Sequence, residues 1–170
     1  MDILFIPCLT FLFSAAYYEM DILEKAGAAS MNTGQGLPRW FRLTREIHVE
    51  IVDKFSGGNV HPDRVMAQWV LVLMISGTRT FRIYGEDHAV HGGEFFLLPP
   101  YVRHYGLQHD EHKAYFAHFQ AEGAETLPPT ELDNSHILLP LWGQVPLELP
   151  CFDLMEYAAC HRAPPFFNEN

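Results

Sequence analysis

Aromatic and polar side chains that could hold a small organic molecule gather in the middle of the chain, between residues 64 and 118. A small-molecule pocket needs mostly apolar and aromatic walls, with a few polar groups that fix the orientation of the ligand. One tryptophan and two tyrosines could supply the walls, and two arginines and two histidines could supply the polar groups. We therefore predict seven ligand-binding residues: Arg64, Trp69, Arg82, Tyr101, His104, Tyr105 and His118.

Several of these residues also fit ordinary structural roles. Trp69 could pack in a hydrophobic core with the neighbouring phenylalanines, and Arg82 could point to solvent because it alternates with Phe81 along a strand. His118 could be a hydrogen-bonded core histidine. His61 precedes a proline in a loop, where it could cover a pocket or have no role. Four histidines beside turn residues are expected to be solvated: His88, His91, His109 and His112.

No arrangement of residues in the sequence points to catalysis. The chain has no recognisable Ser/His/Asp triad, no phosphate-binding glycine loop and no HExxH motif. Its three cysteines, Cys8, Cys151 and Cys160, are widely spaced and form no CxxC pair, which argues against a zinc knuckle or a dithiol redox site. We therefore predict a binding protein without enzyme activity, catalytic residues, cofactor or metal.

Composition and charge indicate one globular domain that does not bind nucleic acid. The chain has 170 residues, and 21 acidic against 11 basic residues give it a net charge of −10. An acidic domain repels the phosphates that supply most non-specific affinity for DNA and RNA. The apolar run at residues 3–18 is shorter than the ~20 residues of a membrane span, and Asp2 stands where an export signal has Lys or Arg. We expect a cytoplasmic protein that does not enter a membrane, with export as the alternative.

Short strands are the elements that must position the candidate residues. From Trp40 onward, short apolar runs are separated by Gly, Pro and Asp, as in β-sandwiches and barrels. Turns are expected at residues 56–59 and at Gly77-Thr78. The expected strands are residues 41–52 (one or two strands), 69–76, 80–84, 88–90, 94–98 and 113–120. After prolines between 128 and 150, apolar residues at helical spacing predict a helix at 151–162.

The stretch from Trp69 to Gly106, WVLVLMISGTRTFRIYGEDHAVHGGEFFLLPPYVRHYG, is similar to the barrel of the cupin superfamily. More narrowly, it resembles the N-terminal effector-sensing domain of AraC-type transcription regulators. The matching features are a buried strand that ends in Ser76-Gly77, the segment FRIYG, the segment GEFFLLPP, and His104 five residues after Pro99. The later segments YFAHFQAEG and ILLP also resemble that family.

The resemblance implies a double-stranded β-barrel of the cupin or jelly-roll type with a small-molecule pocket, then helices that dimerise, then a helix-turn-helix DNA-binding domain. Residues 1–36 would be an N-terminal segment, either an arm whose first 29 residues move on binding or a packed strand or helix; residues 37–125 would be the barrel, and 126–170 the linker and helix of a homodimer. No pair of basic helices follows, so we expect the DNA-binding domain to be absent from this chain. The expected function is to sense a sugar or an aromatic or carboxylic compound for an AraC-like regulator.

The same resemblance allows a second interpretation, a metal-dependent cupin enzyme such as an isomerase or a dioxygenase. Metal-binding cupins hold the ion with two His and a Glu from a first motif and one His from a second. The corresponding first-motif positions here are Arg64, Met66 and Val70, none of which can replace its counterpart as a ligand, and only His104 matches the second motif. A stand-alone binding cupin with no DNA-binding partner is the third interpretation.

Overall fold

The computed structural model describes residues 39–44, 47–127, 136–139, 141–145 and 150–161. The apolar run at 3–18 and the N-terminal segment at 1–36 therefore lie outside the described residues. The described parts contain eleven strands and one helix. These are β1 (Arg39–Leu43), β2 (His48–Asn59), β3 (Arg64–Val65), β4 (Trp69–Ile83), β5 (Glu86–His91), β6 (Glu94–Leu98), β7 (Arg103–Gly106), β8 (Asp110–Gln120), β9 (Gly123–Thr126), β10 (His136–Leu139), β11 (Leu141–Gln144) and α2 (Cys151–Cys160).

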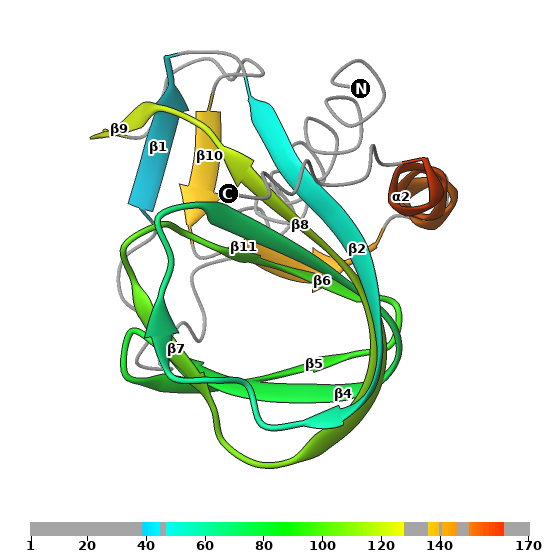
Figure 1. The fold of residues 1–170 in the computed structure, drawn as a ribbon. Helices are drawn as coiled ribbons and strands as arrows, with labels where there is room; N and C mark the ends of the chain where they lie inside the picture. The colour runs from blue at the N-terminus through cyan, green and yellow to red at the C-terminus, as the bar shows by residue number, and fades with distance from the viewer. Residues whose placement is uncertain (1–38, 45–46, 128–135, 140, 146–149, 162–170) are drawn as a thin grey trace, which may run out of the picture.

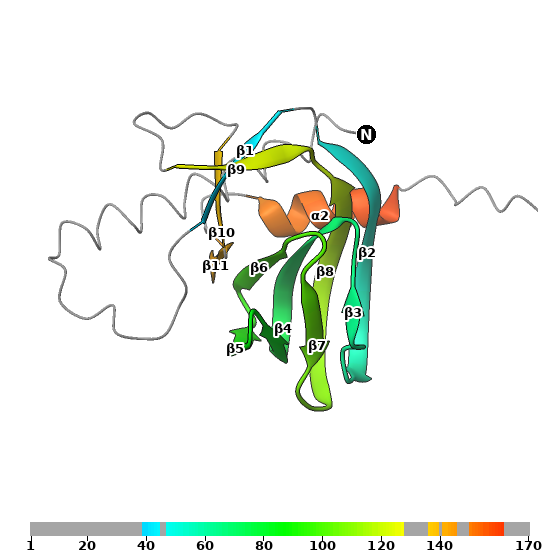
Figure 2. The same ribbon diagram turned by 90° about the vertical axis from the view of Figure 1, so that its left-hand side faces the viewer.

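The strands form a mainly β fold of the jelly-roll type, as predicted, with two antiparallel layers that face each other across an interior (Figure 1). One layer has the order β11-β6-β4-β8-β2, and the other contains β5, β4, β7 and β3. The layers share β4, and among the described strands no pairing closes them into a ring. A third, small sheet of β10, β1 and β9 lies beyond one end of the barrel (Figure 2).

The predicted turn at Gly77-Thr78 is wrong, because β4 runs without interruption from Trp69 to Ile83. Gly77 has a φ of 82°, and the pairing register with β8 shifts between Met74 and Ser76. A Cβ at Gly77 would collide with the backbone of Glu111 on β8. The glycine therefore permits a bulge, which bends the strand from one layer into the other. The turn expected at residues 56–59 is also wrong, since these residues continue β2.

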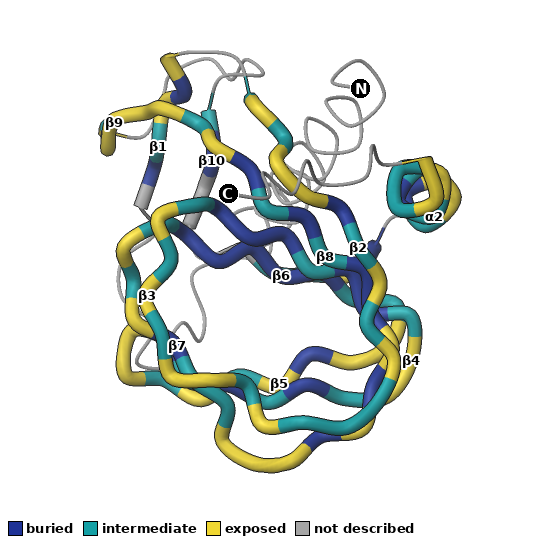
Figure 3. The backbone as a smooth tube through the Cα atoms, viewed as in Figure 1, coloured by how far each residue is buried: buried dark blue, intermediate teal, exposed yellow. Residues whose placement is uncertain are grey.

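Two hydrophobic clusters lie on opposite faces of the β4 layer. The outer cluster includes Trp69, Leu71, Leu73 and Phe119, together with Cys151 and Met155 from α2. The helix lies outside the barrel next to β2 (Figure 1), where Glu156 bonds to Lys54 and to the Tyr115 hydroxyl. The inner cluster lines the interior and comprises Val70, Met74, Phe81, Ile83, Val90, Phe96, Leu98 and Ala114. Figure 3 shows that the central parts of β6 and β8 are buried, as residues between two clusters must be.

Alternation along β8 separates the two faces. Phe116 and His118 lie opposite Val72 and Val70 of β4, so they face the interior. Tyr115, Ala117 and Phe119 face the outer cluster and α2. The helix predicted at 151–162 is confirmed, and its last residue is Cys160. No helix within the described residues is both long and apolar enough to cross a membrane.

Candidate ligand-binding site

Arg64 and His104 face the interior of the barrel from neighbouring strands. Arg64 on β3 lies directly opposite His104 on β7, and His104 lies opposite Ile83 on β4. Residues that are paired across antiparallel strands point to the same face of a sheet. Ile83 belongs to the inner hydrophobic cluster, and His104 is 0% exposed. Both polar side chains therefore lie on the inner surface rather than on the outside of the barrel.

His61 completes this group from the loop before β3. Its ring stacks on the ring of His104, with centroids 5.1 Å apart and planes at 15°. The loop is held against β7, because the amide of Gly106 donates to the carbonyl oxygen of His61 at 2.9 Å. A Cβ at position 106 would lie 2.5 Å from the His61 nitrogen, so only glycine allows this close approach.

Three polar atoms in this group are buried without a hydrogen-bond partner: His61 Nε2, Arg64 Nε and His104 Nε2. A buried polar group that lacks a partner costs about 1–3 kcal/mol, so native proteins rarely leave several in one place. Here three adjacent side chains carry such atoms and line an interior surface. The cluster has the unused hydrogen-bonding capacity that a bound polar molecule would fill.

The neutral form of His104 presents a hydrogen-bond acceptor to the interior. Its Nδ1 lies 3.0 Å from the carbonyl oxygen of Val102. A carbonyl oxygen can only accept, so Nδ1 carries the proton and Nε2 has a free lone pair in the neutral ring. Burial lowers the pKa of His104, and burial together with Arg64 lowers the pKa of His61 to about 3. Both rings are therefore uncharged at neutral pH.

Arg64 is a cation without a counter-ion among the residues that the structure describes. Within the described part of the chain it forms no ion pair, and burial alone lowers the pKa of its guanidinium. The surface arginines differ: Arg82 bonds to Asp87 through two nitrogens at 2.5 and 2.8 Å, and Arg103 bonds to Asp63 in the same way at 2.8 and 2.5 Å. The interior position of Arg64 has positive charge that no described carboxylate neutralises.

A second polar group lies where β2 and β8 meet the bend of β4, and its members satisfy one another. Arg79 donates to the side chain of Asn59 and lies 3.5 Å from Nε2 of His112, whose ring stacks on Phe55. Asp110 accepts from the amide and the hydroxyl of Thr80, both at 2.6 Å. This group holds the bent strands together and leaves little hydrogen-bonding capacity for a ligand.

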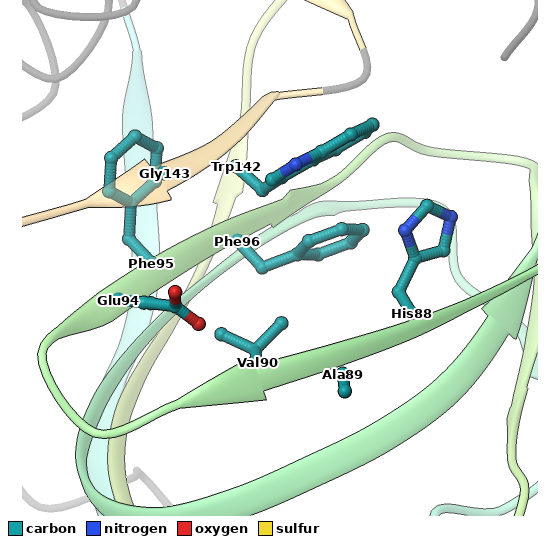
Figure 4. Close-up of a pocket in the computed structure, with 8 residues that line it drawn as sticks. All are labelled: His88, Ala89, Val90, Glu94, Phe95, Phe96, Trp142 and Gly143. Carbon is teal, nitrogen blue, oxygen red and sulfur yellow. The ribbon is translucent and has the colours of Figure 1, made fainter. Parts of the chain in front are cut away.

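An aromatic pocket of about 180 Å³ lies at the opposite side of the interior, between β5, β6 and β11 (Figure 4). Trp142 stacks on Phe96 with centroids 6.1 Å apart, and the His88 ring lies 5.0 Å from Trp142. In Figure 4 these three rings face one another, whereas Phe95 points to the other side of β6. Phe96 and Val90 belong to the inner cluster that also contains Ile83, the strand partner of His104.

Of the seven residues predicted from the sequence, the structure brings three to the interior: Arg64, His104 and His118. Trp69 packs in the outer cluster, and its Nε1 donates to the carbonyl oxygen of Ala121 at 3.3 Å. Arg82 and Tyr105 are strand partners on the outer face, opposite in direction to Phe81 and His104. Tyr101 is 76% exposed in the loop between β6 and β7.

Sequence reasoning missed His112, Trp142 and His88 and left His61 undecided. His112 is buried and His88 is half-buried, so the expectation that both are solvated is wrong, whereas His91 and His109 are exposed as expected. Continuing the period-2 alternation from His118 through Phe116 to His112 would have placed His112 inside. No signal in the sequence shows that the His61 loop lies against β7.

Within the described ranges, no group of three or more His, Cys, Asp or Glu side chains is placed to hold a metal ion. The resemblance places the first-motif ligands at three positions that line or border the interior: Arg64, Met66 and Val70. A guanidinium at that position repels a cation and cannot coordinate one. The chemistry that this inner surface offers is therefore hydrogen bonding to a neutral or anionic organic group.

The sequence matches the family model of the AraC-like ligand binding domain over residues 53–140, just over half of the chain. The chain belongs to this family. No curated protein matches it significantly. Similar solved structures include a candidate mannose-6-phosphate isomerase from Ralstonia eutropha JMP134, which is 16% identical over 56% of this chain and 94% of that chain, with a TM-score of 0.34. They also include oxalate decarboxylase from Bacillus subtilis, which is 13% identical over 71% of this chain and 38% of that chain, with a TM-score of 0.31.

Proposed function

We propose that the protein binds a small organic effector in the interior of the jelly-roll and serves as the sensing domain of an AraC-like transcription regulator in the cytoplasm. One observation carries the binding part: three adjacent interior side chains, His61, Arg64 and His104, have buried polar atoms without partners. The membership in the AraC-like ligand binding family supports the same function. His118 is the fourth polar residue of the site, because it faces the interior. Its pKa is lowered mainly by burial and further by the nearby charge of Arg64.

Binding would act on the rest of a regulator through a shift between two arrangements of the domain. A ligand can move such an equilibrium only by its difference in affinity for the two states, and couplings of about 1–3 kcal/mol are usual. The helix α2 packs on the strands β2 and β8, whose other faces line the interior. Residues 126–170, which contain α2, are the proposed dimerisation region, and the chain itself is not proposed to bind DNA or to catalyse a reaction.

The binding function is tested by thermal unfolding of the full chain in the presence of a panel of sugars, organic acids and aromatic compounds. At least one class should raise the melting temperature in proportion to the logarithm of its concentration. Arg64→Met and His104→Leu should abolish that rise. Arg82→Met, which changes a paired arginine on the outer face, should retain it. Binding that survives both interior substitutions would contradict this site.

The regulatory function needs a separate experiment. The chain is fused to a DNA-binding module that acts only as a dimer, and reporter expression is measured with and without the compound that binds. Expression should change on addition of the compound, and Arg64→Met should remove the change. A compound that binds the domain but leaves expression unaltered at saturation would contradict the role as a sensor and leave the binding function intact.

A further inference from the structure

We infer that the ligand is an organic anion with a hydroxyl group beside its carboxylate and an apolar or aromatic body, that is, a 2-hydroxycarboxylate. This inference rests on the proposed binding function and names the chemical class of its ligand. It combines three properties of one surface: an unpaired cation, a free acceptor next to it, and an apolar lining. Each property excludes a group of compounds that the other two would accept.

The unpaired cation selects a negative charge. Arg64 is half-buried, forms no ion pair within the described residues, and leaves its Nε without a partner. The surface arginines Arg82 and Arg103 each hold an aspartate by two hydrogen bonds. A guanidinium matches the planar geometry of a carboxylate, and the resulting charge-assisted bonds are about twice as strong as neutral ones. The group that pairs with Arg64 in the complex is therefore a carboxylate of the ligand.

The free acceptor next to this cation selects a hydroxyl group. His104 uses Nδ1–H for the carbonyl oxygen of Val102, so its Nε2 can only accept while the ring is neutral. A carboxylate has no proton to donate to this atom. A hydroxyl on the neighbouring carbon has one, and Arg64 and His104 lie directly opposite each other on adjacent strands. One ligand fragment that holds an acceptor and a donor side by side would satisfy both residues.

The lining of the interior selects an apolar body. Met66 and Val102 flank the polar group and pack against the inner cluster. Phe81, Ile83 and Phe96 continue this apolar lining across the interior, and Phe96 also borders the separate pocket that contains Trp142 and His88 (Figure 4). A sugar would place several hydroxyl groups against these side chains without partners, at a cost for each one. A hydrocarbon chain or a phenyl ring would instead gain from burial there.

Two matched series of compounds test the inference by isothermal titration of the full chain. The phenyl series is mandelate, phenylacetate and 1-phenyl-1,2-ethanediol, and the alkyl series is 2-hydroxyhexanoate, hexanoate and 1,2-hexanediol. In each series the second compound lacks the hydroxyl and the third lacks the charge. The hydroxy acid of at least one series should bind at least tenfold more tightly than both of its relatives, since each lost interaction involves a buried or charged partner.

Variants assign each preference to a residue. With Arg64→Met the hydroxy acid should bind only as well as the diol, and Arg64→Lys should recover part of the preference for charge. With His104→Leu, which removes the acceptor, the hydroxy acid should lose its tenfold advantage over the simple acid while the preference for charge remains. Arg82→Met is the matched control, because it removes an arginine from the outer face and should change none of the six affinities.

The outcomes separate this inference from the binding function. A diol that binds as tightly as its hydroxy acid, a preference for charge that survives Arg64→Met, or binding of none of the six compounds would overturn the 2-hydroxycarboxylate. If a neutral sugar then binds and Arg64→Met or His104→Leu weakens it, the binding function stands without this ligand class. If compounds bind but neither substitution affects any of them, both the site and the ligand class are wrong.

Discussion

Arg64 and His104 lie opposite each other on β3 and β7, and each has an inward polar atom that no other group in the described structure engages. One of these atoms donates and the other accepts. The pair is thus a donor and an acceptor held at a fixed spacing by the strand register. Because the strands set that spacing, a ligand that bound there would meet a prepared site and would order few side chains.

Removing the unpaired cation should stabilise the ligand-free protein. Arg64→Met replaces the guanidinium by an apolar group of similar length and removes the cost of burying an unpaired charge. We expect a gain of about 1 kcal/mol, or about 2–4 °C in melting temperature, from differential scanning calorimetry without ligand. Arg82→Met should give no gain, because it breaks an exposed ion pair worth about 0–1 kcal/mol. A loss of stability in Arg64→Met would show that this residue has a structural partner.

Gly106→Ala should displace the loop that carries His61. The added methyl group would lie 2.5 Å from the His61 nitrogen, so the loop must move away from β7. We expect a loss of about 1–3 kcal/mol in urea denaturation, together with weaker effector binding. Gly85→Ala is the control: its φ of 82° disfavours alanine, but no atom lies within 4 Å of the new methyl group. That control should lose about 1 kcal/mol and bind effector normally.

The free energy of unfolding should begin to fall near pH 6.5, a higher pH than the range in which carboxylates titrate. Burial lowers the pKa of His61 to about 3 and that of His104, His112 and His118 in the same direction, whereas unfolded histidine titrates near 6.5. Below pH 6.5 the unfolded chain therefore binds more protons than the folded chain. Full stability is present above pH 6.5 and is lost as the pH falls, with each neutral histidine contributing up to about 1.4 kcal/mol per pH unit.

Urea denaturation at pH 7.5, 6.5 and 5.5 measures this dependence. Arg64, Arg79, His104 and His112 surround His61 and all oppose its protonation. His61→Phe should consequently reduce the slope between pH 6.5 and 5.5. Equal slopes for the wild type and His61→Phe would mean that His61 accepts a proton in the folded state.

The contact of α2 with the barrel should depend on Met155, which is 1% exposed and belongs to the outer cluster. Met155→Ala should cost about 2–5 kcal/mol by leaving a cavity. Hydrogen exchange should show faster exchange at the α2 amides in this variant. Tyr157→Ala on the exposed side of the same helix should change stability by less than about 1 kcal/mol and leave exchange in α2 unaltered. Equal effects of the two substitutions would contradict the described packing.

Sequence reasoning predicted the fold class and the strand at 94–98 because short apolar runs and the glycine and proline residues that bound them are local signals. It could not decide which face of the strand Trp69 lies on, because residues 69–76 are apolar at alternate and intervening positions alike and so do not show which face is buried. It placed a turn at Gly77 because glycine marks turns and bulges alike, and only the pairing with β8 distinguishes them. The pair of Arg64 and His104 joins residues 40 positions apart, and a register at that separation has no local signature.

Tyr115 and Phe116 are consecutive residues of β8, and they point in opposite directions: the first reaches the helix through Glu156, and the second reaches the interior. A ligand in the interior would therefore contact one side of a strand whose other side contacts the helix. Because a single strand separates the interior from the helix, substitutions at interior positions of β8 should also affect how α2 packs.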